Sequence, residues 1–187
     1  GLALSPANGE TGVLCDLAAP ALAGARIHAD ATQAAGRVPF AFRGLASAAL
    51  SAHKLGGPKG VGALIHDDLR GPAPLIPGGG QEGGWRGGTE NVIGIAGFGA
   101  AAEAALRDLD AGLWERVARL RDRLELRISE SCAQIKLVGF DSPRLPNTTC
   151  LLAEGWPGET QVMRLDLAGF AVSAGSACSS GKVERSH

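Results

Sequence analysis

Three side chains that could act together in catalysis follow one short apolar run. Residues 45–50 are small and apolar and favour a strand, and Ser51, His53 and Lys54 come directly after it. A lysine in water is charged and a poor nucleophile, but at the end of a buried strand it can lose its proton and attack a carbonyl. An amine beside hydroxyl and imidazole donors suits a phosphorylated aldehyde cofactor. The alternative is a strand–turn–strand with a solvated lysine, because the glycine-rich residues 56–60 predict a turn into a second apolar run.

A carboxylate stands at the end of another predicted strand. Residues 25–29 favour a strand, Asp30 follows them, and Gln33 lies in the turn beyond. In open α/β sheets, ligands bind at the carboxyl ends of the strands. Asp30 therefore has two interpretations. It is either a cap or turn aspartate, or a buried carboxylate that keeps a ring nitrogen of a cofactor protonated by charge pairing.

A glycine-rich segment, residues 78–91, precedes a predicted helix over 91–106. Its seven glycines permit unusual backbone dihedral angles and a close approach to a ligand. Thr89 is a suitable N-cap residue, and a helix start with Arg86 nearby suits a phosphate group. A flexible surface loop would also explain the glycines.

The four cysteines include no CxxC pair and show no zinc-ligand spacing, so no metal site is expected. Reduced thiols in the cytoplasm are the expected state. Cys178 stands in a segment rich in glycine and serine, which predicts an exposed loop where a thiolate could react; an inert thiol is the alternative. The surroundings of the other three are apolar or helical, as is typical of core or bystander thiols: Cys15, Cys132 and Cys150.

The composition indicates a globular protein with one large domain or two small ones. The chain has 187 residues, of which 45% are hydrophobic and 20% are charged, and its net charge is −1. Without a basic surplus, a nucleic-acid or acidic-membrane partner is not expected. No apolar run reaches the roughly 18 residues that a membrane span needs. The chain is expected to be a piece of a longer protein.

Hydrophobic periodicity predicts the remaining elements. Apolar residues three or four apart predict an amphipathic helix from 109 to about 131, and its surface arginines are interpreted as plain solvation. A change in composition near 106–110 predicts two domains, 1–108 and 109–187. The other expectations are a loop at 1–12, a short helix at 16–23, strands at 135–139, 148–152 and 170–173, and a helix at 158–167.

Five stretches resemble motifs of the cysteine desulfurases, which are pyridoxal-phosphate (PLP) enzymes of the class V aminotransferase group. In family order, they are residues 8–12 (Asn-Gly-Glu-Thr-Gly), 28–33 (His-Ala-Asp-Ala-Thr-Gln), 51–60, 78–91 and 173–181. Each is weak alone, but five in order over almost the whole chain are highly specific. The resemblance implies an α/β fold of PLP-dependent transferase type I: the later half of the large domain, then most of the small C-terminal α/β domain.

The resemblance also implies how the cofactor is held. Lys54 would carry PLP on its amine and later move protons. Asp30 would pair with the pyridinium nitrogen and so make the ring an electron sink. Gln33 would hydrogen-bond the phenolic oxygen of the ring, and Ser51 and His53 would hold the phosphate.

Two further residues complete the implied site. Thr89 would reach the phosphate from the partner subunit of a homodimer. Cys178, in a segment similar to the longer, mobile catalytic loop of one branch of the family, would attack the sulfur of PLP-bound L-cysteine. The products would be L-alanine and a Cys178 persulfide, which would pass its sulfur to an iron–sulfur scaffold protein or a tRNA-thiolation acceptor.

The chain departs from the family pattern in several places. The ring-contacting asparagine of the family falls on Gly9, and the stretch from Gly12 to Asp30 is a few residues short. The family's N-terminal half, with its ring-stacking histidine, is absent, and the substrate-carboxylate arginine is expected beyond His187. Two other functions therefore stay open: a related PLP lyase acting on selenocysteine or cysteine sulfinate, and a non-catalytic folding or dimerisation unit.

Overall fold

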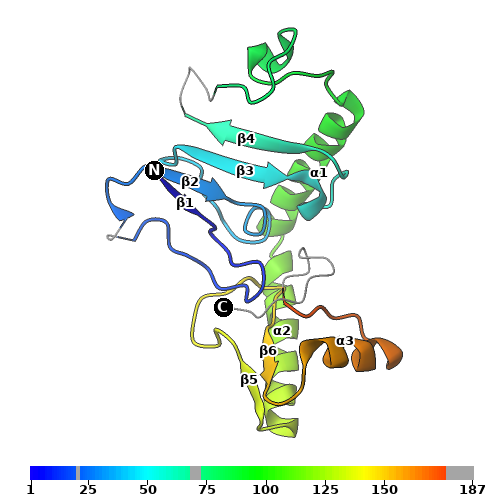
Figure 1. Ribbon diagram of the computed structural model, residues 1–187. Coiled ribbons are helices and arrows are strands. Elements are labelled where there is room, and N and C mark those ends of the chain that lie inside the picture. Colours follow the sequence, from blue (N-terminus) through cyan, green and yellow to red (C-terminus); the bar gives the residue numbers. More distant parts are fainter. Residues whose placement is uncertain (20–21, 68–72, 176–187) are drawn as a thin grey trace. The chain divides into compact units, whose positions relative to one another are not determined.

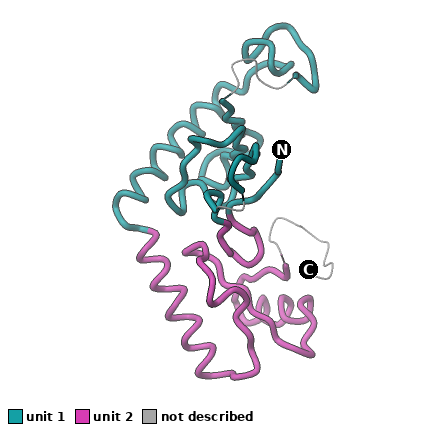
Figure 2. Tube along the Cα trace, turned by 90° about the vertical axis from the view of Figure 1, so that its left-hand side faces the viewer, with its two compact units in different colours: residues 1–6, 16–113 teal, residues 7–15, 114–187 magenta. Residues whose placement is uncertain are grey.

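The computed structural model describes residues 1–19, 22–67 and 73–175. The chain forms two compact units, which Figure 2 colours separately. The first comprises residues 1–6 and 16–113, and the second comprises 7–15 and 114–187. The predicted domains, 1–108 and 109–187, are parts of the large and small domains of a longer protein, and this division stays a prediction.

The first unit is built on a four-stranded sheet with strand order β1-β2-β3-β4 (Figure 1). The strands are β1 (Leu2–Leu4), β2 (Ile27–Asp30), β3 (Ser47–Ser51) and β4 (Gly62–His66). The first three are parallel, whereas β4 runs antiparallel to β3. Strands β2 and β3 correspond to the strands predicted at 25–29 and 45–50, and β4 to the apolar run after the turn at 56–60, whereas β1 lies where a loop is predicted. Three adjacent parallel strands bring their carboxyl ends to one edge of the sheet.

One face of this sheet forms the core of the first unit. In β2 the residues alternate between buried and exposed, so Ile27 and Ala29 point into the core while His28 and Asp30 point outward. Leu45 and Ala48 complete the buried cluster, and partly buried apolar side chains pack against it: Leu4, Leu17, Leu22, Ala25, Phe40 and Phe42. The rings of Phe40 and Phe42 meet edge to face, with centroids 4.9 Å apart.

Small residues let helix α1 (Val92–Asp110) approach the turn after β3. A Cβ atom added at Gly57 would lie 3.2 Å from the Cβ of Ala101, and one added at Gly97 would lie 2.7 Å from Pro58. The N-cap of α1 is Asn91, whose Oδ1 accepts a hydrogen bond from the Gly94 backbone N–H at 3.1 Å. The prediction of Thr89 as the cap is therefore wrong. Before α1, the glycine-rich segment contains a short irregular turn, η3 (Gln81–Gly84), in which Glu82 and Gly83 have positive φ angles of 52° and 67°.

The second unit contains two helices and a two-stranded sheet. Its elements are α2 (Leu113–Ser131), β5 (Ile135–Leu137), β6 (Leu151–Ala153) and α3 (Gly158–Leu167), and β5 pairs with β6 antiparallel. The loop 7–15 joins the rest of this unit through a backbone bridge between Val13 and Arg144, and a second bridge, between Ala7 and Leu14, closes the loop on itself. The expected helices at 109–131 and 158–167 are both present.

Two further predicted elements are wrong. Residues 16–19, the first half of the helix predicted at 16–23, are not helical, whereas residues 20 and 21 lie outside the described part of the chain; residues 170–175 have no strand. Phe170 and Val172 are exposed, at 62% and 47%, so the apolar run there has no sheet to join. In the described residues, no helix is long and apolar enough to cross a membrane.

Candidate functional site

The carboxyl ends of β2 and β3 bring most of the predicted site residues to one edge of the sheet. Asp30 is the last residue of β2 and pairs with Ala49 of β3, so β3 extends two residues further, to Ser51. A single 3-10 turn, η2 (Ala52–Lys54), follows directly. The ends of two adjacent parallel strands therefore place the Asp30 carboxylate near the turn that carries Lys54.

Local hydrogen bonds fix the carboxylate of Asp30. Its Oδ1 accepts bonds from the backbone N–H of Thr32 at 3.1 Å and from the Thr32 hydroxyl at 2.7 Å. These are the bonds of a turn aspartate. The expected burial is wrong, because the alternation of β2 puts Asp30 on the exposed face. The carboxylate is thus both oriented by its turn and accessible to a ligand.

The hydroxyl of Ser51 and the imidazole of His53 form a pair. Ser51 Oγ and His53 Nδ1 are 2.8 Å apart, and the direction of the proton depends on the tautomer of the ring. His53 is exposed, whereas Ser51 and Lys54 are half-buried. The backbone N–H groups of Leu55 and Gly57 bond to the Ala52 carbonyl at 2.9 and 2.8 Å, which closes the turn.

The other predicted site residues are less closely gathered. Gln33 lies in the turn after Asp30 and is half-buried. Thr89 is exposed in the segment before α1, and its side chain forms no hydrogen bond in the described part of the chain. Cys178 lies outside the described residues.

One contributor to this edge was missed by the sequence analysis. The guanidinium of Arg37 donates hydrogen bonds to the carbonyls of Gln33 and Lys54 at 2.7 and 2.8 Å. The only signal in the sequence is one basic residue inside the mostly apolar run 34–42.

A different carboxylate is buried in the second unit. Glu125 of α2 is 2% exposed, and Arg144 donates to both of its oxygens at 2.7 and 2.8 Å. Thr149 also donates to Glu125, and Arg121 donates to the carbonyl of Leu145 at 2.7 Å. The interpretation of the α2 arginines as plain solvation is therefore wrong for Arg121, and the burial of Glu125 was not predicted.

The hydrogen bonds from Arg144 lower the pKa of Glu125, against burial, which acts to raise it, and the bond from Thr149 lowers it further. In the same unit, burial raises the pKa of the Cys150 thiol, and the negative charge of Glu10 adds to the effect. Cys150 therefore has the properties of an unreactive thiol.

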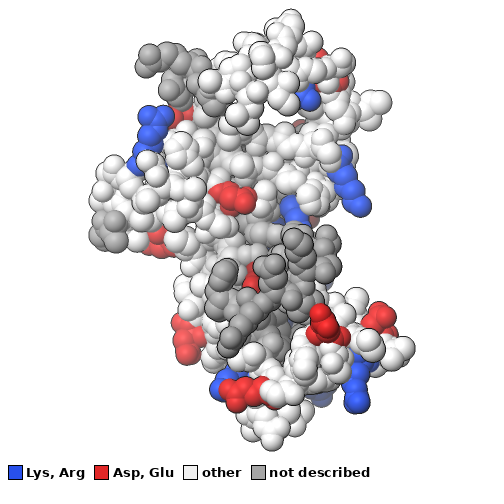
Figure 3. Space-filling view, in the orientation of Figure 1, with Lys and Arg blue, Asp and Glu red and all other residues white. Residues whose placement is uncertain are grey.

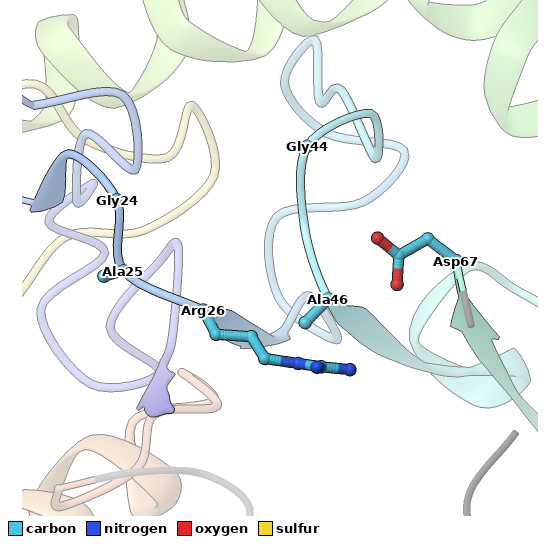
Figure 4. Close-up of a pocket in the computed structure, with 6 residues that line it drawn as sticks. All are labelled: Gly24, Ala25, Arg26, Gly44, Ala46 and Asp67. Carbon is cyan, nitrogen blue, oxygen red and sulfur yellow. The ribbon is translucent and has the colours of Figure 1, made fainter.

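The opposite edge of the first unit's sheet carries an open hollow of about 410 Å³. Its lining includes Arg26 and Asp67, whose charged ends extend toward the same space (Figure 4). None of the predicted site residues lines it. On the face drawn in Figure 3, acidic and basic side chains are interspersed among the described residues.

The side chains at the carboxyl edge fit the cofactor that the resemblance implies. PLP offers an aldehyde, a ring nitrogen that becomes positive and a phosphate. The edge supplies an amine at Lys54, an exposed carboxylate at Asp30, and the hydroxyl–imidazole pair of Ser51 and His53. The amine is complementary to the aldehyde, the carboxylate to the positive ring nitrogen, and the hydroxyl–imidazole pair to the phosphate.

Comparison with known proteins relates almost the whole chain to a single enzyme family. Residues 2–186 match the model of the family described as aminotransferase class-V. A cysteine desulfurase of Cereibacter sphaeroides is 46% identical over 187 residues, which cover 97% of this chain and 47% of that protein. A cysteine desulfurase of Enterobacter agglomerans is 42% identical, with coverages of 97% and 46%. The chain thus spans about half the length of the relatives it matches.

Solved structures agree with the sequence comparisons. The X-ray structure of a NifS-like protein from Rickettsia africae ESF-5 superposes with a TM-score of 0.86 at 34% identity, covering 93% of this chain and 49% of that chain. SspA, solved in complex with cysteine, superposes with a TM-score of 0.66 at 27% identity, with coverages of 94% and 49%. The predicted α/β fold of type I and the predicted family are confirmed, and the chain belongs to the aminotransferase class-V family.

Proposed function

We propose that this chain is part of a PLP-dependent cysteine desulfurase, which removes sulfur from L-cysteine to give L-alanine and an enzyme persulfide. The observation that carries the proposal is the gathering of Asp30, Ser51, His53 and Lys54 at one edge of the sheet. Homology to proteins named cysteine desulfurase supports the choice of reaction.

Each residue of the edge has a proposed task. When bound, PLP supplies an electron sink next to the substrate carbon. The Lys54 amine binds the aldehyde and moves protons, while the Asp30 carboxylate, oriented by Thr32, holds the proton on the ring nitrogen. Ser51 and His53 bind the phosphate, and Gln33 donates to the phenolic oxygen of the ring.

The sulfur transfer is assigned to Cys178. Its thiolate attacks the sulfur of the bound L-cysteine, the carbon–sulfur bond breaks, and the substrate carbon takes a proton to become the methyl group of alanine. One sulfur atom moves to Cys178, so the products are alanine and the Cys178 persulfide. The acceptor of that sulfur is proposed to be an iron–sulfur scaffold protein or another sulfur-acceptor protein.

A homodimer is part of the proposal, with Thr89 reaching the phosphate of the partner subunit. Large apolar side chains on both sides of Thr89 are exposed in the single chain: Leu75 at 100%, Ile76 at 73%, Val92 at 70% and Ile93 at 88%. Exposed apolar residues in such number favour a protein–protein contact. The free thiols of Cys15, Cys132 and Cys150 support a reducing, cytoplasmic setting.

The experiment is to incubate the PLP-loaded protein with L-cysteine and to measure alanine together with the masses of its cysteine peptides. We expect alanine release and the addition of one sulfur atom to the Cys178 peptide. Cys178→Ser should lose both, because a hydroxyl cannot form a persulfide, whereas the control Cys150→Ser should keep both. Full alanine release by Cys178→Ser, or an added sulfur on Cys150 instead, would overturn the proposed transfer.

A further inference from the structure

The backbone pairing between β2 and β3 ends at Asp30, within the candidate site. The last paired residues are Asp30 and Ala49, and the N–H of Ala31 still bonds to the Ala49 carbonyl at 3.0 Å. Beyond this point the chain continues as two separate segments: the turn 31–37 after β2, and η2 after β3. The relative placement of Gln33 and Lys54 depends on how these two segments are held together.

The side chain of Arg37 joins the two segments. One guanidinium nitrogen donates to the Gln33 carbonyl at 2.7 Å and, more weakly, to the Thr32 carbonyl at 3.4 Å. The other donates to the Lys54 carbonyl at 2.8 Å. Because the guanidinium is planar and rigid, its two nitrogens fix both carbonyls in one geometry.

The backbone at Gly36 packs closely against the Leu55 side chain at the same place. Gly36, next to Arg37, has a φ of +74°, and a Cβ atom added there would lie 2.3 Å from Leu55 Cδ2. An L-residue with a Cβ atom would be strained at this positive φ and would displace the end of the Leu55 side chain. Two independent features therefore hold the turn 31–37 against Lys54 and Leu55: the hydrogen bonds of the Arg37 guanidinium and the contact of Gly36 with Leu55.

We infer that Arg37 is a positioning residue. It sets the direction in which the side chain of Lys54 extends from its turn, relative to Asp30 and Gln33. The carbonyl that Arg37 holds belongs to Lys54 itself, so the bond fixes the peptide plane next to the Cα atom that carries the amine side chain. The inference rests on the proposed function, in which the Lys54 amine must meet an aldehyde whose ring is held at Asp30.

The test uses the PLP-loaded protein with Arg37→Gln, which removes the charge and the fork, and Arg37→Lys, which keeps the charge alone. Arg43→Gln is the matched control, because Arg43 is exposed six residues further along. The first readout is the rate at which borohydride fixes PLP on Lys54, followed by peptide mass spectrometry. The second is kcat and KM for L-cysteine.

A displaced reacting group costs about a hundredfold in rate for a 1 Å shift, so we expect Arg37→Gln to lower the fixation rate and kcat by about ten- to a hundredfold, with little change in KM. Arg37→Lys should fall between Arg37→Gln and the unmodified protein. Arg43→Gln should behave as the unmodified protein in both assays.

Amide hydrogen exchange provides a readout that needs no cofactor. In Arg37→Gln, amide exchange should become faster at Leu55, Gly57 and Ala35, whose N–H groups form the hydrogen bonds within the two turns. Exchange should stay unchanged at the backbone hydrogen bonds between β2 and β3. Faster exchange throughout the sheet would mean a general loss of stability and would contradict a positioning role.

The outcomes separate the two claims. If borohydride treatment of the unmodified protein leaves no reduced PLP on Lys54, the proposed function fails and the inference fails with it. If reduced PLP is found on Lys54 of the unmodified protein and Arg37→Gln matches Arg43→Gln, only the inference is overturned. If Arg37→Gln does not fold, the inference is tested with Arg37→Lys alone. An unchanged rate of PLP fixation on Lys54 and unchanged amide hydrogen exchange in that variant would show that the planar guanidinium is not needed.

Discussion

Asp30 in the first unit and Glu125 in the second are both carboxylates held by hydrogen bonds, but their surroundings are opposite. Asp30 is exposed, and its carboxylate accepts hydrogen bonds from the N–H and the hydroxyl of a residue two positions away. Glu125 is buried, and its partners, Arg144 and Thr149, are 19 and 24 residues away. One carboxylate belongs to a turn at a sheet edge, and the other ties distant segments together.

This difference shows which carboxylate is available for chemistry. A buried carboxylate that already accepts from a bidentate arginine and a hydroxyl has little capacity left for a ligand. Asp30 is oriented by neutral donors, and within the described residues no arginine is among its hydrogen-bond partners. The comparison supports the proposed cofactor role of Asp30 and a role in stability for Glu125, so mutation of each is expected to affect only its own property.

The largest effect on stability is expected from Glu125→Gln. Removing one member of a buried ion pair leaves Arg144 buried without its counter-charge, which costs about 3–5 kcal/mol in the free energy of unfolding. Urea denaturation measures this change. Glu154→Gln is the matched control, since Glu154 pairs with Lys136 at 2.6 Å but both side chains are exposed, and little change is expected there. Equal effects of the two substitutions would remove the distinction between a buried and a surface pair.

Asp30→Asn should act on the rate instead. The amide keeps the size and can still accept from Thr32, but it cannot stabilise a positive ring nitrogen. A lost catalytic charge contact costs about a hundred- to a thousandfold in kcat, and we expect a loss of that order here. The urea midpoint should stay close to that of the unmodified protein. Unchanged kcat would show that Asp30 is only a turn residue.

A smaller, pH-dependent effect should distinguish the same two carboxylates. The pKa of Glu125 is lowered in the folded state, so its contribution to stability is fully present above the unfolded pKa of about 4.3 and is lost as the pH falls through the lower folded pKa. Urea midpoints between pH 7 and about pH 3 should therefore fall less in Glu125→Gln than in the unmodified protein. Parallel curves for the two proteins would contradict the sign of this linkage.

The local elements could be predicted because their signals are local. The end of β2 at Asp30, the turn after β3 and the start of α3 at Gly158 follow from short apolar runs and the turn residues beside them. β1 was missed because Leu2–Leu4 is only three residues long and depends on pairing with β2. The strand predicted at 170–173 failed because an apolar run does not form a strand without a partner.

The long-range contacts could not be predicted for a related reason. Glu125 lies among charged residues of an amphipathic helix, and its burial depends on Arg144 in a loop far along the chain. Arg37 is harder still, because its acceptors are backbone carbonyls, which every residue has. The location of Asp30, Ser51, His53 and Lys54 at strand ends could be predicted from short apolar runs followed by polar residues, whereas their roles stay a proposal.

The central claim is that the Lys54 amine, at the carboxyl edge of the first unit's sheet, is the group that binds PLP. The most direct measurement is borohydride reduction of the PLP-loaded protein, followed by mass spectrometry of its peptides. We expect the mass of reduced PLP on the Lys54 peptide, its loss in Lys54→Ala together with turnover, and its retention in Lys59→Ala, a nearby exposed lysine. Reduced PLP on Lys59 or another lysine, or normal turnover by Lys54→Ala, would contradict the account.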